Sequence, residues 1–307
     1  MGHQTGPRPG DDVLGAARPA ASIVVPAHDE QAVIGRLLDS LAEGLDGARL
    51  DVVVACNGCT DRTAEIARDR GARVVEVPEP SKIAALDAGD AAAVGFPRFY
   101  VDADVVLTGR AVLDVAAALA EPGALAGAPP IRVEDAGRSW AVRGFYAVWD
   151  ALPYFEDAPI GSGVYAVSEA GRARFDQFPD VIADDLFARN LFRRSERRVP
   201  DTDPFVVQAP WSVRALVRRR VRIYAGNMQI AAHPELGRLP GGQEPSEPWW
   251  RAVLRRPSLM PAAGPYLAVN TVAKLQARRL VRSARPVAWG RDDTTRTVAA
   301  GPAGSAP

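Results

Sequence analysis

The chain has 307 residues, 47% of them hydrophobic and 24% charged, and its formal net charge is zero. That length is enough for one large hydrophobic core with a small addition, and the composition is ordinary for a globular protein. The charge balance gives no sign of a nucleic-acid partner, and a chain with only two cysteines, Cys56 and Cys59, is not a disulfide-stabilised scaffold.

Residues 1–20 are rich in Gly, Pro, Ala and charged residues, contain no apolar signal region and predict a disordered tail. Beyond them, short apolar runs with the character of buried strands lie at 22–25, 50–55, 73–77 and 99–101. Segments with helical character alternate with these runs at 31–45, 60–70 and 82–94. This alternation predicts an α/β fold with a mostly parallel central sheet and helices on both faces.

Residues at the ends of two expected helices support these boundaries. Thr60 or Asp61 can cap the second helix, and Gly71 is a stop signal directly after it. We expect Ser81 to begin the third helix.

Polar segments follow three of the expected strands, at 26–30, 56–59 and 102–104. In open parallel sheets, ligands bind beyond the carboxyl ends of the strands. The sequence therefore predicts a ligand site where these three segments meet.

Asp102 and Asp104 flank a small residue directly after the fourth apolar run. Alternate residues of a strand point the same way, so both carboxylates reach one site if the extended backbone continues through them. Two close carboxylates are unfavourable without a cation between them, and a hard divalent ion with diphosphate oxygens would satisfy them. We therefore predict that Asp102 and Asp104 bind a metal ion.

These motifs, in their order along the chain, resemble those of the family 2 glycosyltransferases, which have the GT-A fold. The matching segments are 23–30, 101–104, 183–186 and the arginine-rich segment that ends at Asn227, so that the resemblance covers about 22–227. It implies transfer of a sugar from a nucleoside-diphosphate sugar to an acceptor hydroxyl, usually with inversion and assisted by Mg²⁺ or Mn²⁺.

The resemblance places Pro26, His28 and Glu30 in the loop that holds the nucleotide, with His28 where an aromatic residue is more usual. In the second loop the family has two acidic residues before a glycine, but this chain has Cys56 and Asn57. Asn57 can still accept from a base N–H, although its amide also donates, so the resemblance does not fix uracil as the base.

The spacing of Cys56 and Cys59 is also compatible with a zinc or redox site. Zinc would need two further ligands, and the histidines of the chain are His3, His28 and His233. We interpret both thiols as small residues of the loop.

Two further segments acquire roles through the resemblance. Lys82, one of two lysines in the chain, opens the third helix, where a cation opposes the helix dipole and is expected to face a phosphate or a carboxylate. Of the paired acids Asp184 and Asp185, the second matches the catalytic base, and the first orients it or caps the helix. Residues 161–163 form a glycine-rich turn that the resemblance places beside the acceptor and the donor sugar.

Several arginines lie on one probable helix between Trp211 and Asn227: Arg214, Arg218, Arg219, Arg220 and Arg222. The family often has a diphosphate-binding arginine element here, and guanidinium groups donate in pairs to phosphate oxygens. We assign diphosphate binding to Arg219 and Arg222.

The C-terminal part is basic: residues 249–291 contain nine basic residues and no acidic one. Such a stretch is as compatible with a solvent-exposed helix as with contact to an anionic membrane surface. We expect a cytoplasmic protein, with peripheral contact to the inner face of the membrane as the alternative. The acceptor stays open between a lipid phosphate, a glycan and a small metabolite.

These observations divide the chain into a tail (1–20), a GT-A glycosyltransferase domain (21–235), and a linker with a basic helical extension and disordered end (236–307). The domain has a nucleotide half at about 21–108 and an acceptor half at about 109–235. One alternative function is a non-catalytic sugar-nucleotide-binding protein, favoured only by the missing acids before Gly58. Nucleotidyl transfer, the other alternative, would require a Gly- or Lys-rich loop after the first strand. Residues 26–30 follow that strand and do not form such a loop.

Overall fold

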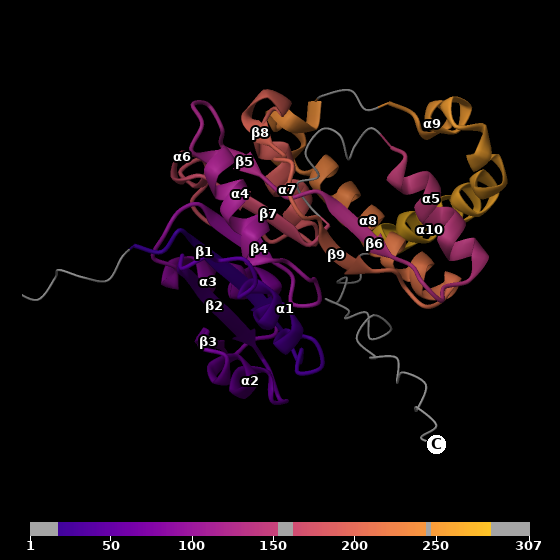
Figure 1. Cartoon of the computed structure of the whole chain (residues 1–307). Helices are drawn as coiled ribbons and strands as arrows, with labels where there is room; N and C mark the ends of the chain where they lie inside the picture. The colour runs from indigo at the N-terminus through magenta and orange to yellow at the C-terminus, as the bar shows by residue number, and fades with distance from the viewer. Residues whose placement is uncertain (1–17, 153–161, 244–246, 284–307) are drawn as a thin grey trace, which may run out of the picture.

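A computed structural model describes residues 18–152, 162–243 and 247–283 (Figure 1). Its main sheet has the strand order β3-β2-β1-β4-β7-β5-β8, and a second sheet pairs β6 with β9. The strands are β1 (Ala21–Ala27), β2 (Leu50–Asn57), β3 (Arg73–Val77), β4 (Arg98–Val101), β5 (Ala126–Gly127), β6 (Ile131–Glu134), β7 (Val164–Val167), β8 (Arg197–Arg198) and β9 (Phe205–Gln208).

Strands β1 to β4 pair in parallel, and β7 joins β4 in the antiparallel direction. The central sheet is therefore mostly parallel, which confirms the α/β prediction. All four expected strands of the first half are present: β3 coincides with its apolar run, and the other three extend one to three residues beyond theirs.

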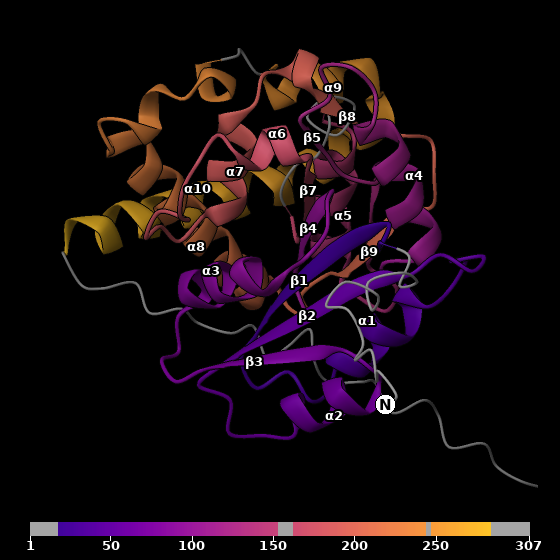
Figure 2. The same ribbon diagram turned by 90° about the vertical axis from the view of Figure 1, so that its left-hand side faces the viewer.

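The α-helices are α1 (Ile34–Leu41), α2 (Thr63–Asp69), α3 (Lys82–Ala92), α4 (Gly109–Leu119), α5 (Trp140–Asp150), α6 (Glu169–Arg172), α7 (Asp184–Leu191), α8 (Val213–Ala232), α9 (Trp249–Arg255) and α10 (Met260–Arg282). Short 3₁₀ turns, among them 240–243, connect α8 to α9. Figure 2 shows α1 and α3 on either side of β1 and β2, so helices cover both faces of the sheet as predicted.

The helix boundaries differ in detail from those expected. α1 is confined to Ile34–Leu41, and α2 begins at Thr63 rather than directly after its expected cap. The side chain of Asp61 still accepts the Thr63 N–H at 2.9 Å and so satisfies a donor of the first turn. Gly71 has a φ of 78°, as a helix-ending glycine requires, and the Ser81 side chain accepts from Ala84 N–H as an N-cap.

Alternation along β1 divides the core between the two faces of the sheet. Ile23 and Val25 pack into a cluster with side chains of α1, α2 and α4. Val24 packs on the other face with side chains of α3 and α7. Both clusters bury large apolar areas, and together they fix the ends of β1 and β4 relative to α3 and α7.

A buried ion cluster ties α3 to the middle of the sheet. The Asp90 carboxylate accepts from Arg98 at 2.8 Å, from the Tyr100 hydroxyl at 2.6 Å and from Arg172 at 2.9 Å. Burial raises the pKa of Asp90, but these donors outweigh it and hold the pKa below its ordinary value. Helix α3 is therefore anchored by an ionised group as well as by its apolar side chains.

The C-terminal helices form a third core. Helix α10 packs along α8 and α5, and Phe145, Leu216 and Tyr266 are buried between them. In Figure 1, α5, α8, α9 and α10 stand together beside the sheet. No helix in the described part of the chain is long and apolar enough to cross a membrane. The expected tail and C-terminal end lie mostly outside the described residues, as do residues 244–246 of the expected linker.

Candidate functional site

A cavity of about 650 Å³ opens beyond the carboxyl ends of β1 and β4. Pro26 lines it from the end of β1, Asp102 from the end of β4, and Lys82 from the start of α3. Asp184 and Asp185 enter from the first turn of α7. The sheet and its crossovers thus bring together residues from four separate segments, three of which contribute charged side chains.

Lys82 lies between two carboxylates in this cavity. Its Nζ is 3.0 Å from an oxygen of Asp102 and 2.9 Å from an oxygen of Asp184. The Asp184 side chain is only 5% exposed, whereas that of Asp102 is 40% exposed to the cavity. Lys82 was expected to face a phosphate or a carboxylate, and in the structure it pairs with two carboxylates.

The charges of this cluster influence one another. Burial disfavours the charged form of Lys82, but Asp102 and Asp184 outweigh it and hold its pKa above the ordinary value of a lysine. Burial also raises the pKa of Asp184 to about 6, and the nearby Asp185 and Asp102 carboxylates add to this against the attraction of Lys82. Lys82 therefore partly balances the negative charge of several crowded carboxylates.

Asp185 points into the cavity and is held by the loop before β7. Its carboxylate accepts the backbone N–H of Ser162 at 3.2 Å and that of Leu186 at 2.8 Å. Ser162 has a φ of 65° and Gly163 a φ of 110°, a turn that presents the Ser162 N–H to α7. The first residue of the predicted glycine-rich turn, Gly161, lies outside the described residues.

The extended backbone expected through Asp102 and Asp104 is absent. Strand β4 ends at Val101, and a turn follows in which the Asp102 N–H donates to Gly163 O at 2.8 Å. Asp102 lines the cavity, but Asp104 is not part of the described lining, and its carbonyl accepts from Arg36. The argument from strand alternation therefore does not apply, because the strand ends three residues before Asp104; metal binding by both residues stays a prediction.

Asp102 retains room for a divalent ion. One of its oxygens is engaged by Lys82, and the other lies beside Gly163, where an added Cβ would come within 3.4 Å of it. The Asp102 side chain is 40% exposed to the cavity, and a hard carboxylate oxygen facing a cavity suits Mg²⁺ or Mn²⁺.

The residues predicted to hold the nucleotide differ in their burial and in their contacts. Pro26 lines the cavity, and the His28 ring is fixed by a 2.6 Å hydrogen bond between Nδ1 and the carbonyl of Asn57. Glu30 is buried, and its carbonyl accepts from the first N–H groups of the α1 segment. The Asn57 side chain is also buried and donates to Ala27 O at 2.9 Å, which joins β1 to β2. Contact of these residues with a nucleotide stays a prediction.

The two arginines assigned to the diphosphate, Arg219 and Arg222, line the cavity from α8, as does Arg220. Enclosure raises the pKa of Asp102, but Lys82 together with Arg222 and Arg219 lowers it below the ordinary value. Arg218 is four residues before Arg222 and so shares a helix face with it, but Arg218 is exposed and is not among the described residues that line the cavity. The structure therefore brings the two chosen arginines near Asp102.

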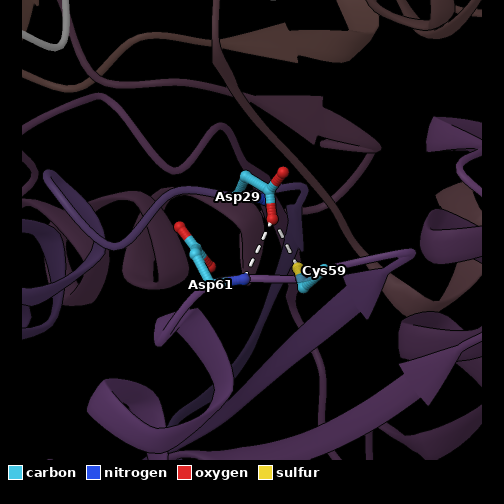
Figure 3. Close-up of side chains that lie close together, drawn as sticks. All are labelled: Asp29, Cys59 and Asp61. Atoms are coloured by element: carbon cyan, nitrogen blue, oxygen red, sulfur yellow. Dashed lines mark hydrogen bonds between the residues drawn. The ribbon is translucent and has the colours of Figure 1, made fainter.

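Asp29, Cys59 and Asp61 form a separate cluster between the first two loops (Figure 3). Their potential ligand atoms all lie within 4.8 Å of one another. Both carboxylates already accept hydrogen bonds: Asp29 from Thr60 N–H at 2.7 Å, and Asp61 from Gln31 N–H at 3.0 Å. Asp29 N–H also donates to the Cys59 sulfur at 3.4 Å. These bonds fasten the two loops together, so we assign the cluster a structural role.

The two thiols differ strongly, and we expect iodoacetamide to alkylate Cys59 but not Cys56. A hydrogen bond from Cys56 lowers the pKa of Cys59 to about 7, and the same bond together with burial raises the pKa of Cys56. Because the thiolate is the nucleophile, the rate of alkylation should rise with pH through about 7 and then level off. Mass spectrometry of the alkylated chain between about pH 5 and 9 measures this, with Cys59→Ser as control. Faster labelling of Cys56, or a midpoint near the usual value of about 8.5, would contradict it.

Tyr165 was not predicted as a site residue. It is buried, lines the cavity and stacks on Tyr100 with ring centres 4.9 Å apart. Its hydroxyl has no hydrogen-bond partner among the described residues, and burial next to Asp184 raises its pKa well above the ordinary value. The sequence holds no signal that Tyr165 lines the site, since the consecutive apolar residues of β7 already explain a buried tyrosine.

Comparisons with known proteins show which family the chain belongs to. Over 93 residues, 28% of this chain, the sequence is 39% identical to a glucosyl-3-phosphoglycerate synthase of Mycolicibacterium paratuberculosis. Over 58 residues, 19% of this chain, it is 43% identical to a 4,4'-diaponeurosporenoate glycosyltransferase of Staphylococcus aureus. The aligned parts span only 28% and 15% of those two proteins.

The fold has a solved counterpart in the mannosyltransferase PcManGT of Pyrobaculum calidifontis, a structure in complex with GDP-Man and Mn²⁺. The two chains are 22% identical, with a TM-score of 0.54 over 87% of this chain and 79% of that one. This likeness supports the GT-A fold. The sequence model of glycosyl transferase family 2 matches residues 22–176, half of the chain, and the protein belongs to that family.

Proposed function

We propose that the protein transfers a sugar from a nucleoside-diphosphate sugar to an acceptor hydroxyl, with inversion at the anomeric carbon. The observation that carries this proposal is the position of the Asp185 carboxylate, which lines the same cavity as Asp102 and is oriented by the Ser162 N–H. Asp102 would bind the metal ion of the diphosphate, and Asp185 would act on the acceptor. The family membership supports the reaction class, and the geometry supports this division of roles.

In the proposed reaction Asp185 accepts the proton of the acceptor hydroxyl while the hydroxyl oxygen forms a bond to the anomeric carbon. The bond from that carbon to the diphosphate oxygen breaks on the opposite face, so the configuration inverts. A bound Mg²⁺ or Mn²⁺ would neutralise charge on the departing diphosphate, with Asp102 as the ligand that faces the cavity and Asp104 as the second expected ligand. Arg219 and Arg222 add positive charge on the same side.

Lys82 and Asp184 have a supporting part in this proposal. Lys82 connects Asp102 to Asp184, and Asp184 directly precedes the base on the first turn of α7. The metal ligand and the base would thereby be fixed relative to each other through the two ion pairs of Lys82.

Peripheral membrane contact is also part of the proposal. The outer face of α10 exposes Met260, Leu267, Val272 and Leu275, and exposed Arg278 and Arg279 follow in the same helix. Apolar side chains beside cations suit the surface of an anionic membrane. This supports an interfacial location for the C-terminal helices.

We expect the full-length chain to release nucleoside diphosphate slowly from a UDP-sugar or a GDP-sugar in the presence of Mn²⁺, and not in EDTA. Donor binding should also raise the melting temperature, because a ligand of the native state stabilises it. Coupled detection of the free nucleoside diphosphate and a thermal-shift series over several donors measure both effects. Absence of release and of any shift with every donor would overturn the proposed function.

A further inference from the structure

The cavity extends from the charged cluster to a region of different chemistry. Part of its lining comes from the second sheet, from α5 and the turn after it, and from the C-terminal helices: Ile131, Val133, Phe145, Tyr146, Trp149, Leu152, Val207, Trp249 and Tyr266. Figure 1 shows the elements that carry most of them, α5, β6, β9, α9 and α10, on the side away from β1 to β3. We call these nine side chains the apolar wall.

The rings of the apolar wall are packed on one another. Phe145 and Tyr266 stack with ring centres 5.1 Å apart, and Trp249 lies 5.4 Å from Tyr266. Tyr146 meets Trp149 edge to face at 5.6 Å. These contacts hold the wall in place without a ligand, so a ligand would meet a preformed surface rather than order one.

The aliphatic members of the wall indicate which ligand it suits. Ile131 and Val133 lie on one face of β6, and Val207 lies on the paired strand β9. Such side chains offer no hydrogen bond to a hydroxyl or a phosphate, and a polar ligand would lose its water there without compensation. An apolar ligand loses little and gains from removing its surface from water. The wall therefore favours an apolar ligand over a glycan.

Two charged side chains at this end of the cavity have partners within the chain. Glu247 is ion-paired with Arg255 at 2.7 Å. Arg220 donates to the Tyr224 hydroxyl at 3.1 Å, and its guanidinium lies 5.7 Å from the ring centre of Phe145. A guanidinium is weakly hydrated and packs flat on aromatic rings, so Arg220 extends the wall rather than interrupting it.

We propose that the acceptor is an amphipathic alcohol, whose hydroxyl reaches Asp185 while its apolar body, a chain or a fused ring, lies against the apolar wall. This inference rests on the proposed glycosyl transfer, and it narrows the acceptor, which the sequence left open between a lipid phosphate, a glycan and a small metabolite. The transfer step is the one already given: the acceptor oxygen bonds to the anomeric carbon, its proton passes to Asp185, and the nucleoside diphosphate leaves.

A series of alcohols tests this with the full-length chain, Mn²⁺ and a sugar-nucleotide donor. Binding of 1-butanol, 1-octanol and triethylene glycol is measured by calorimetry, and transfer to each by mass spectrometry of the product. We expect affinity to increase about 3- to 4-fold per added methylene, on the order of 10²-fold from butanol to octanol. Triethylene glycol, which matches octanol in length, should bind no better than butanol.

Equal binding of octanol and triethylene glycol, or a preference for an oligosaccharide acceptor over octanol, would overturn the inference. Hydrolysis of the donor, in which the sugar is transferred to water, is followed in the same samples. If hydrolysis is seen without any dependence on chain length, only the acceptor class is wrong. If neither hydrolysis nor donor binding is seen, the proposed function itself fails.

Two adjacent tryptophans provide a matched pair of variants. Trp249 belongs to the apolar wall, whereas Trp250 is 47% exposed on the outer side of α9. Trp249→Ala should weaken octanol binding by roughly tenfold and leave that of triethylene glycol unchanged, because only the apolar ligand uses the ring. Trp250→Ala should change neither, and equal effects of the two substitutions would contradict the assignment. If Trp249→Ala lowers the stability of the protein, the alcohol series on the unmodified chain still tests the inference.

Discussion

Replacing Asp185 by Asn is expected to slow sugar transfer by roughly 10²–10⁴-fold, the usual contribution of a positioned general base. Asparagine keeps the size of the side chain, and its carbonyl can still accept the Ser162 N–H that orients Asp185 at 3.2 Å. It cannot accept the acceptor proton at neutral pH. The loss should therefore fall on the rate of transfer, whereas the affinity for nucleoside diphosphate and Mn²⁺ should stay within about twofold.

Steady-state transfer and calorimetric binding of the nucleoside diphosphate separate these two effects. Asp180→Asn is a suitable control, since it makes the same chemical change at an exposed position five residues earlier. It should leave both rate and affinity unchanged. If Asp185→Asn retains a rate close to that of Asp180→Asn, the base must be another residue.

Replacing Lys82 by Met is expected to lower the free energy of unfolding by about 3–5 kcal/mol, the usual effect of removing one partner of a buried ion pair. The Asp184 side chain, 5% exposed, would lose the cation at 2.9 Å. Methionine has nearly the length of lysine and is apolar, so the variant tests the charge rather than the packing. Chemical denaturation of both proteins without metal measures the difference.

Lys274→Met provides the matched control, because Lys274 is the other lysine of the chain and is exposed on α10. Its removal should cost no more than about 1 kcal/mol, as for an exposed cation near the Tyr224 ring. In a double-mutant cycle, adding Asp184→Asn to Lys82→Met should recover much of the loss, since no charge is then left unpaired. Equal effects of the two lysine substitutions, or no coupling to Asp184, would rule out the bridging role.

Much of the fold follows from local sequence signals. Apolar runs separated by helical segments were enough to place β1 to β4 and to predict the sheet, because a parallel strand buried on both faces needs consecutive apolar residues. The stop at Gly71 and the cap at Ser81 were likewise local, and each is present. What these signals could not give was the length of a strand, and for this reason the extended geometry expected through Asp104 failed.

The sequence predicted several residues of the candidate site, but not the contacts between them. Asp102, Lys82 and Asp185 could each be chosen from a motif, but the ion pair between Lys82 and Asp184 depends on how the start of α3 meets the start of α7. No spacing in the sequence encodes that meeting. The same holds for the apolar wall, whose members are spread from Ile131 to Tyr266 and look like ordinary core residues within their own helices and strands.

The central claim is that Asp102 holds the metal ion of the departing diphosphate, and Mn²⁺ binding in the presence of a saturating nucleoside diphosphate tests it most directly. Titration of the unmodified chain, of Asp102→Asn and of Asp61→Asn compares the cavity with the Asp29, Cys59 and Asp61 cluster. We predict that Asp102→Asn weakens Mn²⁺ binding at least about tenfold, as loss of a charged ligand should, and that Asp61→Asn does not. Unchanged binding in Asp102→Asn, or a loss in Asp61→Asn alone, would contradict the claim.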